Sequence, residues 1–187
     1  GMSTVYRATE PSLGGNVALK VMSAALSTDE SFRTRFIYEA RQAAAIDHPN
    51  VVPIYGSGEA EGRLYIAMRY VAGSDLSQIV RDSGPLAPTR VADLLTQAAA
   101  ALDAVHRAGM VHRDVKPHNF LVTPPDGSDE REHLYLADFG LTRSDARSQI
   151  TKTGEFLGTL AYAPPEQLKN EAITPASDVY ALGCVLY

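Results

Sequence analysis

His112-Arg113-Asp114-Val115-Lys116-Pro117-His118-Asn119 is the stretch that decides the fold of this chain, hereafter the 112–119 loop. Pro117 has no backbone N–H and fixes its own φ, and it disfavours the α conformation at Lys116. The sequence therefore predicts an irregular loop carrying a base, a cation and a neutral oxygen ligand, and catalytic groups tend to lie on such loops. Taken alone, the same residues would also suit a polar turn on an ordinary protein surface.

The composition excludes several classes of protein. The 187 residues suffice for one or two small domains, and 45% hydrophobic with 21% charged residues is ordinary for a globular protein. A formal net charge of −5 argues against a general nucleic-acid or anionic-membrane binder. Cys184 is the single cysteine of the sequence, so neither a disulfide framework nor a thiolate metal cluster is available.

The two ends of the sequence indicate a fragment. The chain opens at Gly1-Met2 without a leading element, and it ends in an apolar, helix-like run, 179–187, with no C-cap. A helix this apolar belongs in a core, so we expect a domain truncated at both ends. No stretch approaches the ~18 apolar residues of a membrane span and no signal peptide is visible, so we expect a cytoplasmic location. A full-length parent anchored in a membrane is compatible with this expectation.

Residues 1–70 are predicted to be rich in strands, with one helix. The helix is expected at 31–46, because apolar residues recur there at spacings of three and four and so form one face. These residues are Phe32, Phe36, Ala40 and Ala43. The predicted strands are 5–9, 17–22, 51–55 and 64–70, with a glycine-rich turn at Gly56-Ser57-Gly58.

After Tyr70 the pattern becomes mainly helical. Apolar residues at Met110-Val111 and at Phe120-Leu121-Val122 predict a short strand on each side of the 112–119 loop. The change of pattern predicts an α+β fold of two lobes, residues 1–70 and 71–187. The other elements expected in the second lobe are helices at 76–81 and 88–108, a strand at 134–139 and a mobile segment at 141–160.

Several polar residues together indicate a phosphate and metal site. Asp114, Asn119 and Asp138 are hard oxygen donors on predicted loops, the kind of ligand that Mg²⁺ prefers. Lys20 interrupts a β-rich run and is a point cation suited to phosphate, and Glu39 could hold it in place. Each residue alone is a weak signal, because a lone lysine in a strand is usually a solvent-facing side chain.

In this order and spacing, these motifs resemble the signature set of the protein kinase superfamily. The resemblance is closest to the bacterial Hanks-type (PknB-like) serine/threonine kinases, particularly those of actinobacteria, and it covers essentially the whole chain. It implies the bilobal kinase fold, with a β-rich N-lobe containing helix C and a mainly helical C-lobe. The matching motifs are Val17-Ala18-Leu19-Lys20, Glu39, His112-Arg113-Asp114, Asn119, Asp138-Phe139-Gly140, Gly158-Thr159, Pro165-Glu166 and Asp178.

The resemblance implies a serine/threonine protein kinase that uses Mg-ATP, with Mn²⁺ as an alternative ion. Asp114 would orient the substrate hydroxyl and accept its proton, and Lys116 would steady the γ-phosphate. Lys20, paired with Glu39, would contact the α- and β-phosphates. Asn119 and Asp138 would bind the metal ion, Thr159 would lie at the substrate-binding end of the activation segment, and Asp178 would brace the loop.

The resemblance also implies a set of nucleotide contacts. Val5, Ala18 and Leu121 would enclose the adenine. The remaining contacts would come from Met68 at the back of the pocket, the backbone of Arg69 and Val71 at the base, Asp75 at the ribose, and Gly1 and Ser3 of the glycine loop at the phosphates.

Regulation is implied as well. Arg113 is expected to be a partly buried cation that receives a phosphate from the activation segment, as in relatives that are switched on in this way. Thr151 and Thr153 are the predicted autophosphorylation sites, whereas Ser144 and Ser148 are not. Serine and threonine are also ordinary constituents of loops, which is the alternative explanation of this pattern.

The sequence departs from the family pattern at a few positions. Ser3 occupies the usual third-glycine slot, Pro164 replaces the usual alanine before Pro165-Glu166, and Arg69 replaces a common acidic residue. The earlier part of the glycine loop and the family's usual partner for Glu166 lie outside the 187 residues. The resemblance therefore leaves open whether the fragment alone is active.

The alternative functions are those of a pseudokinase and of a small-molecule phosphotransferase. A pseudokinase acting as a scaffold would normally have lost Lys20, Asp114 or Asp138. A small-molecule phosphotransferase would lack the activation segment, 140–166, and the His-Arg-Asp-x-Lys-Pro motif. The partners implied are protein substrates with Ser or Thr and a kinase homodimer for autophosphorylation, with no nucleic acid and no membrane contact from this segment.

Overall fold

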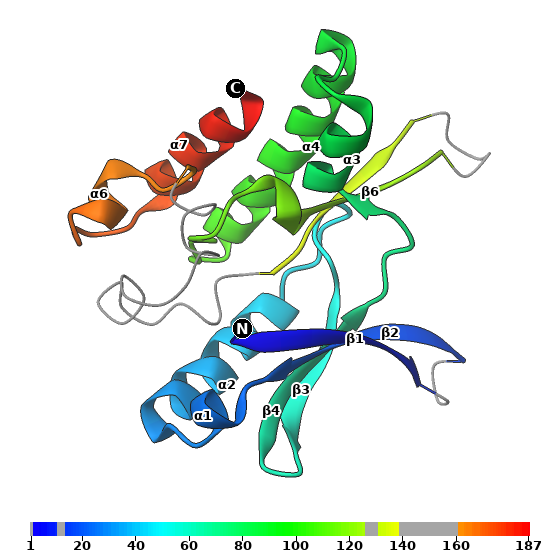
Figure 1. The fold of residues 1–187 in the computed structure, drawn as a ribbon. Coiled ribbons are helices and arrows are strands. Elements are labelled where there is room, and N and C mark those ends of the chain that lie inside the picture. The colour runs from blue at the N-terminus through cyan, green and yellow to red at the C-terminus, as the bar shows by residue number, and fades with distance from the viewer. Residues whose placement is uncertain (1, 11–13, 126–130, 139–160) are drawn as a thin grey trace. The chain divides into compact units, whose positions relative to one another are not determined.

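The computed structural model describes residues 2–10, 14–125, 131–138 and 161–187. Their contacts divide the chain into two compact units. Unit 1 comprises residues 1–47 and 52–72, and unit 2 comprises residues 48–51 and 73–187. Strands dominate unit 1 and helices dominate unit 2 (Figure 1), so the architecture is α+β, as the sequence predicts.

Unit 1 is built on a four-stranded antiparallel sheet in the order β1-β2-β4-β3. Side chains alternate along β4, where Leu64, Ile66 and Met68 are buried and form part of the core of the unit. Two helices follow β2, and the second of them packs against β3. The elements are β1 (Ser3–Glu10), β2 (Gly15–Met22), α1 (Ala24–Ser27), α2 (Glu30–Ala44), β3 (Ile54–Ala60) and β4 (Arg63–Arg69).

The helix α2 begins where the sequence supplies an N-cap. Oδ1 of Asp29 accepts a hydrogen bond from the backbone N–H of Phe32 at 3.0 Å, which satisfies one donor of the first turn. All four apolar residues of the predicted face are buried, and the rings of Phe32 and Phe36 stack with centroids 5.8 Å apart. The helix predicted at 31–46 is therefore confirmed, with an end two residues earlier, at Ala44.

The turn predicted at Gly56-Ser57-Gly58 is wrong. These residues lie inside β3, and the hairpin reverses instead at Glu61 and Gly62, which have φ of 51° and 70°. Gly58 pairs with Tyr65, whose ring covers it so closely that a Cβ at Gly58 would lie 2.8 Å from the Tyr65 hydroxyl oxygen. The glycine is present because an aromatic side chain occupies the space of its missing one, and not because the chain turns there.

Unit 2 combines helices with a three-stranded antiparallel sheet in the order β5-β6-β7. The long helix α4 packs against β7 and α7, and its core face is rich in alanine, which permits close approach. The elements are β5 (Ser74–Asp75), α3 (Leu76–Ser83), α4 (Pro88–Arg107), the 3₁₀ helix η1 (Pro117–Asn119), β6 (Phe120–Thr123), β7 (His133–Leu136), α6 (Pro165–Leu168) and α7 (Pro175–Leu186).

No strand forms at Met110-Val111, which corrects the prediction made for these residues. The N–H of Met110 donates to the carbonyl oxygen of Val105 at 3.2 Å, and Gly109 adopts a φ of 75°. This arrangement closes the end of α4, so the backbone that a strand would need is used by the helix terminus. The strand predicted on the other side of the loop is present as β6.

Residues 48–51 lie between α2 and β3 in the sequence but pack within unit 2. The carbonyl oxygen of Asn50 accepts from the N–H of Leu136 at 2.7 Å, and Val51 forms a parallel bridge with Leu136. The Asn50 amide donates to the carbonyl oxygen of Leu134 and to Oε1 of Gln97. These contacts occupy the outer edge of β7, which the three-stranded sheet would otherwise expose.

None of the helices in the described ranges combines the length and the apolar character that crossing a membrane requires.

Candidate functional site

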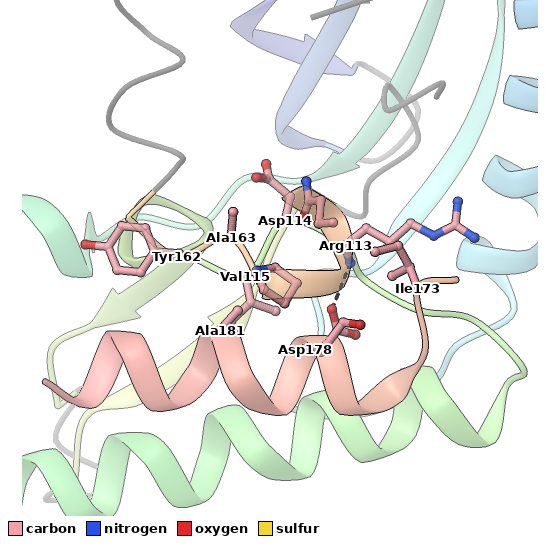
Figure 2. A pocket seen from close by; sticks show the side chains of 11 residues that line it. Arg113, Asp114, Val115, Tyr162, Ala163, Ile173, Asp178 and Ala181 are labelled. Carbon is pink, nitrogen blue, oxygen red and sulfur yellow. Dashed lines mark hydrogen bonds between the residues drawn. The ribbon is translucent and has the colours of Figure 1, made fainter. Parts of the chain in front are cut away.

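The 112–119 loop is held by one buried carboxylate. Asp178, on α7, is 1% exposed and accepts hydrogen bonds from the N–H groups of His112 at 2.8 Å and Arg113 at 2.9 Å. Nε2 of His106 lies 2.8 Å from the same carboxylate. Figure 2 shows Asp178 reaching from the helix to the backbone of the loop. Three hydrogen-bonding partners compensate the burial of a charge that would otherwise be costly.

The backbone at Arg113 adopts an unusual conformation. Its φ is 64°, in the left-handed region that residues with a side chain rarely adopt, and Asp138 has a φ of 57°. Such conformations persist where the surroundings over-determine them, and they gather at functional sites. At Arg113 the carboxylate of Asp178 supplies that constraint, because two successive N–H groups must point to it.

His112 connects the loop to the end of β7. Its side chain is fully buried, Nε2 lies 3.0 Å from the carbonyl oxygen of Ala137, and Nδ1 lies 3.3 Å from the N–H of Asp114. A carbonyl oxygen only accepts and an N–H only donates, so Nε2 carries the hydrogen and Nδ1 accepts. Burial lowers the pKa of His112, which keeps the ring neutral as this pattern requires.

Two side chains of the loop, those of Lys116 and Asn119, converge on the carboxylate of Asp114. Lys116 Nζ lies 3.0 Å from Oδ2 of Asp114, and Nδ2 of Asn119 lies 3.1 Å from the same oxygen. The Asn119 amide also donates to the carbonyl oxygen of Asp114 at 2.7 Å. Asp114 is therefore held in one orientation, beside a cation whose side chain is 23% exposed.

The two predicted metal ligands, Asn119 and Asp138, lie on neighbouring stretches of backbone. The N–H of Ala137, the residue before Asp138, donates to the carbonyl oxygen of Asn119 at 2.8 Å. Because the Asn119 amide nitrogen faces Asp114, its amide oxygen is the atom suited to a cation. Among the described residues no group of three or more His, Cys, Asp and Glu is arranged to hold a metal ion.

Opposite the loop, residues from the second part of unit 2 complete a pocket (Figure 2). Arg113 and Asp114 of the loop line it together with Tyr162 and Pro164. Glu166, on α6, accepts a hydrogen bond from the hydroxyl of Ser177 on α7. The sequence assigned no role to His106, Asn50, Gln97 or Ser177, because their partners lie far away along the chain.

In unit 1 the strand register brings most of the predicted nucleotide contacts to one face of the sheet. Val5 pairs with Lys20, and Ala18 pairs with Met68, so these four side chains share a face. Ser3 joins them through its pairing with Met22. Lys20 is only 8% exposed, which is unusual for a lysine in a strand and contradicts the alternative of a solvent-facing side chain.

The other predicted contacts of unit 1 are those of Glu39, Arg69 and Val71. Glu39 is half-buried on α2, and its pairing with Lys20 stays a prediction. The N–H of Arg69 donates to the carbonyl oxygen of Pro53 at 2.9 Å, and the backbone contact of Arg69 with the base stays a prediction. Val71 is half-buried, and its backbone contact with the base also stays a prediction.

In unit 2, Asp75 and Leu121 are brought together. They are paired residues of β5 and β6, and both are half-buried. Oδ1 of Asp75 accepts from the N–H of Gln78 at 2.9 Å and caps α3, so its second oxygen is the atom suited to a ribose hydroxyl.

Some predictions fall outside the described residues, and one is corrected. Gly1, Thr151, Thr153 and Thr159 lie outside the described ranges. Arg113 was expected to be partly buried, but it is exposed. The reason is its left-handed backbone, since the N–H groups of His112 and of Arg113 itself face Asp178 and the Arg113 side chain does not share that direction.

Comparisons with known proteins show the family of the chain. The family model described as "Protein kinase domain" matches residues 1–187. Serine/threonine-protein kinase PknJ of Mycobacterium tuberculosis is 44% identical over 100% of this chain, which covers 31% of the length of PknJ. The chain spans about a third of that relative.

Solved structures give the same result. The crystal structure of the Mycobacterium tuberculosis PknI kinase domain matches with a TM-score of 0.78 and 35% identity, over 99% of this chain and 67% of that one. The structure of Rad53 1-466 in complex with AMP-PNP matches with a TM-score of 0.77 and 28% identity, over 100% of this chain and 44% of that one. With its α+β fold and its match along the whole length, the chain belongs to the protein kinase domain family.

Proposed function

We propose that the protein carrying this chain is a serine/threonine protein kinase, which transfers the γ-phosphate of ATP to hydroxyl groups of protein substrates. The observation that carries the proposal is the arrangement around Asp114. Its carboxylate has Lys116 Nζ at 3.0 Å and Asn119 Nδ2 at 3.1 Å, on a loop that Asp178 holds. Similarity to PknJ, a named serine/threonine-protein kinase, supports the choice of substrate class.

In the proposed reaction Asp114 acts as the base. It orients the substrate hydroxyl and accepts its proton as the oxygen attacks the γ-phosphorus, and the bond to the β,γ-bridging oxygen breaks to leave ADP. Lys116 lies beside the carboxylate and stabilises negative charge on the transferred group. The rigid network of the loop supports this role, because phosphoryl transfer depends on positioning more than on covalent chemistry.

The proposed nucleotide and metal contacts are given for each unit by itself. In unit 2, Asn119 and Asp138 are the residues that would hold Mg²⁺, which neutralises charge on the phosphates when bound. In unit 1, Lys20 would bind the α- and β-phosphates and pair with Glu39. The other proposed contacts are Gly1, Ser3, Val5, Ala18, Met68, Arg69 and Val71 from unit 1, and Asp75 and Leu121 from unit 2. AMP-PNP bound to the related Rad53 chain supports a nucleotide of this kind.

We also propose activation by autophosphorylation between two copies of the kinase. Arg113 is an exposed guanidinium and so is accessible to a phosphate from the activation segment. Thr151 and Thr153 are the proposed acceptors, with Thr159 in the substrate-binding end of the same segment. Phosphopeptide mass spectrometry of the natural protein is expected to find the modification on these two threonines. Signal confined to Ser144 or Ser148 would contradict this assignment.

The test of the function is phosphoryl transfer by the natural protein that contains these residues. Wild type with Mg-ATP and a generic protein substrate is expected to incorporate phosphate, and Asp114→Asn is expected to lower the rate by about 10³-fold or more. Asp103→Asn, an exposed carboxylate of α4, is the matched control and should keep the wild-type rate. Incorporation that survives Asp114→Asn would refute the assigned base.

The same assay separates the alternative functions. ATP binding without turnover would indicate a scaffold. Phosphate transfer to a small metabolite but to no protein would indicate a small-molecule phosphotransferase.

A further inference from the structure

Ser177 is a buried hydroxyl beside the residue that holds the 112–119 loop. It is the third residue of α7, only 2% exposed, and it directly precedes Asp178 in the chain. Neither its residue type nor its position in the sequence suggested a role. Its contacts in the folded chain do.

The Ser177 hydroxyl uses both of its hydrogen-bonding roles. It donates to Oε1 of Glu166 on α6, and it accepts from the backbone N–H of Thr174 at 3.2 Å. The backbone N–H of Ser177 donates to the carbonyl oxygen of Thr174 at 2.9 Å. The hydroxyl thereby joins the first turn of α7 to α6, which ends the segment that follows Tyr162.

The hydrogen bond that Ser177 donates to Glu166 ends on a charged carboxylate. The hydrogen bond from Ser177 is the largest cause that lowers the pKa of Glu166, so the carboxylate is ionised at neutral pH. A hydroxyl donating to a carboxylate makes a shorter and stronger hydrogen bond than one between neutral groups. The contact is therefore suited to fixing the relative position of two short elements.

The position of Ser177 determines that of Asp178. Successive residues of an α-helix are about 100° apart around its axis, so holding one side chain sets the direction of the next. The Asp178 carboxylate receives the N–H groups of His112 and Arg113 at 2.8 and 2.9 Å. A rotation or shift of the first turn of α7 would lengthen both contacts, and Asp114 follows Arg113 directly. In Figure 2 residues of the loop, of the segment at Tyr162 and Ala163, and of α7 surround one pocket.

We propose that Ser177 is a positioning residue for phosphoryl transfer. Its hydroxyl couples Glu166, at the end of the segment that reaches from Tyr162 to α6, to Asp178 and through it to the backbone of the catalytic base. Ser177 touches neither nucleotide nor substrate in this proposal. The proposal rests on the kinase function proposed above.

The first measurement is steady-state kinetics on the natural protein. Ser177→Ala is expected to lower kcat about tenfold, the loss of one hydrogen bond to a charged group, while KM for ATP changes less than twofold. Thr96→Ala removes an exposed hydroxyl of α4 that bonds only within its own helix, and it should leave kcat unchanged. A Ser177→Ala enzyme with kcat within twofold of wild type would overturn the proposal.

The second measurement tests the partner. Glu166→Ala is expected to reproduce the loss, and the double variant with Ser177→Ala should be no worse than either single one, because the two act as a unit. Glu166→Gln keeps an acceptor oxygen for the hydroxyl and should lose less activity than Glu166→Ala. Additive losses would overturn the coupling. Glu166 is only half-buried, so its variants are expected to fold. They therefore test the proposal even if Ser177→Ala fails to fold.

The third measurement does not depend on activity. Hydrogen exchange of the peptide that covers 112–116 is expected to be faster in Ser177→Ala than in wild type and unchanged in Thr96→Ala. Unchanged exchange in both variants would overturn the proposal. A wild-type protein that transfers no phosphate would refute the proposed function instead, and the exchange experiment would still decide whether Ser177 holds the loop.

Discussion

Nε2 of His112 lies 3.0 Å from the carbonyl oxygen of Ala137, and this contact joins the 112–119 loop to the end of β7. The proposed base, Asp114, comes two residues after His112. Asp138, a proposed metal ligand, directly follows Ala137. The ring accepts the N–H of Asp114 on its other side. A buried, neutral imidazole therefore sets the distance between two functional segments.

This burial makes stability depend on pH. The pKa of His112 lies below its ordinary value of 6.5 in the folded state, so the unfolded chain binds the proton first. The stabilisation is fully present above pH ~6.5 and is lost as the pH falls below it, by up to about 1.4 kcal/mol per pH unit. Denaturant titrations of the natural protein between pH 5 and 8 measure this change in the free energy of unfolding. His118→Gln, an exposed histidine of the same loop, is the control, and an unfolding free energy independent of pH below 6.5 would contradict the prediction.

Asp178→Asn should destabilise the loop, although the substituted side chain has nearly the same volume. The amide would direct one N–H group at a donor, since His112 and Arg113 both present N–H groups to the carboxylate. We expect a loss of about 2–4 kcal/mol in the free energy of unfolding, together with faster hydrogen exchange at Arg113. The same substitution at Asp103, which is exposed, should cost less than ~0.5 kcal/mol. Equal effects of the two substitutions would show that the buried contacts contribute nothing.

Asn50→Asp tests the edge of β7. The Asn50 amide donates to Oε1 of Gln97 at 3.0 Å and to the carbonyl oxygen of Leu134 at 2.9 Å, and a carboxylate would set oxygen against oxygen at both places. Gln97 cannot compensate by turning over, because its Oε1 also accepts the N–H of Leu134. We expect about 2–4 kcal/mol of destabilisation at pH 7. Asn16→Asp, on an exposed strand position, is the control, and a stable Asn50→Asp protein would refute the described network.

Gly73→Ala tests the close approach of the segment before β5 to β6. A Cβ at Gly73 would lie 2.1 Å from the carbonyl oxygen of Val122, and that atom belongs to backbone that cannot move aside alone. Relief requires a shift of β6, which carries Leu121, so we expect about 1–3 kcal/mol of destabilisation and a weaker affinity for ATP. At Gly56 a Cβ would meet nothing within 4 Å, so Gly56→Ala should be close to neutral. Thermal unfolding and ATP binding of both variants check this, and an unaffected Gly73→Ala protein would contradict it.

Much of the fold could be predicted from sequence wherever the signal is local. The buried face of α2 follows from residues three and four apart, and its N-cap, Asp29, lies directly before it. The turn at 56–58 could not be predicted correctly, because the glycine pattern does not reveal that Tyr65 covers Gly58 from the neighbouring strand. The prediction of a strand at Met110-Val111 failed for a similar reason, because the N–H of Met110 is used by the end of α4.

The sequence by itself determined which residues are available as the proposed base, cation and metal ligands, and their order along an irregular segment that Pro117 imposes. These properties depend on residue type and on neighbours a few positions away. The tertiary structure alone decided how that segment is held, by Asp178 under its backbone, His112 between Asp114 and Ala137, and Ser177 against Glu166. Such contacts join residues that are distant in the chain, and no local periodicity encodes them, because only the packing of α7, α6 and β7 brings their atoms within hydrogen-bonding distance.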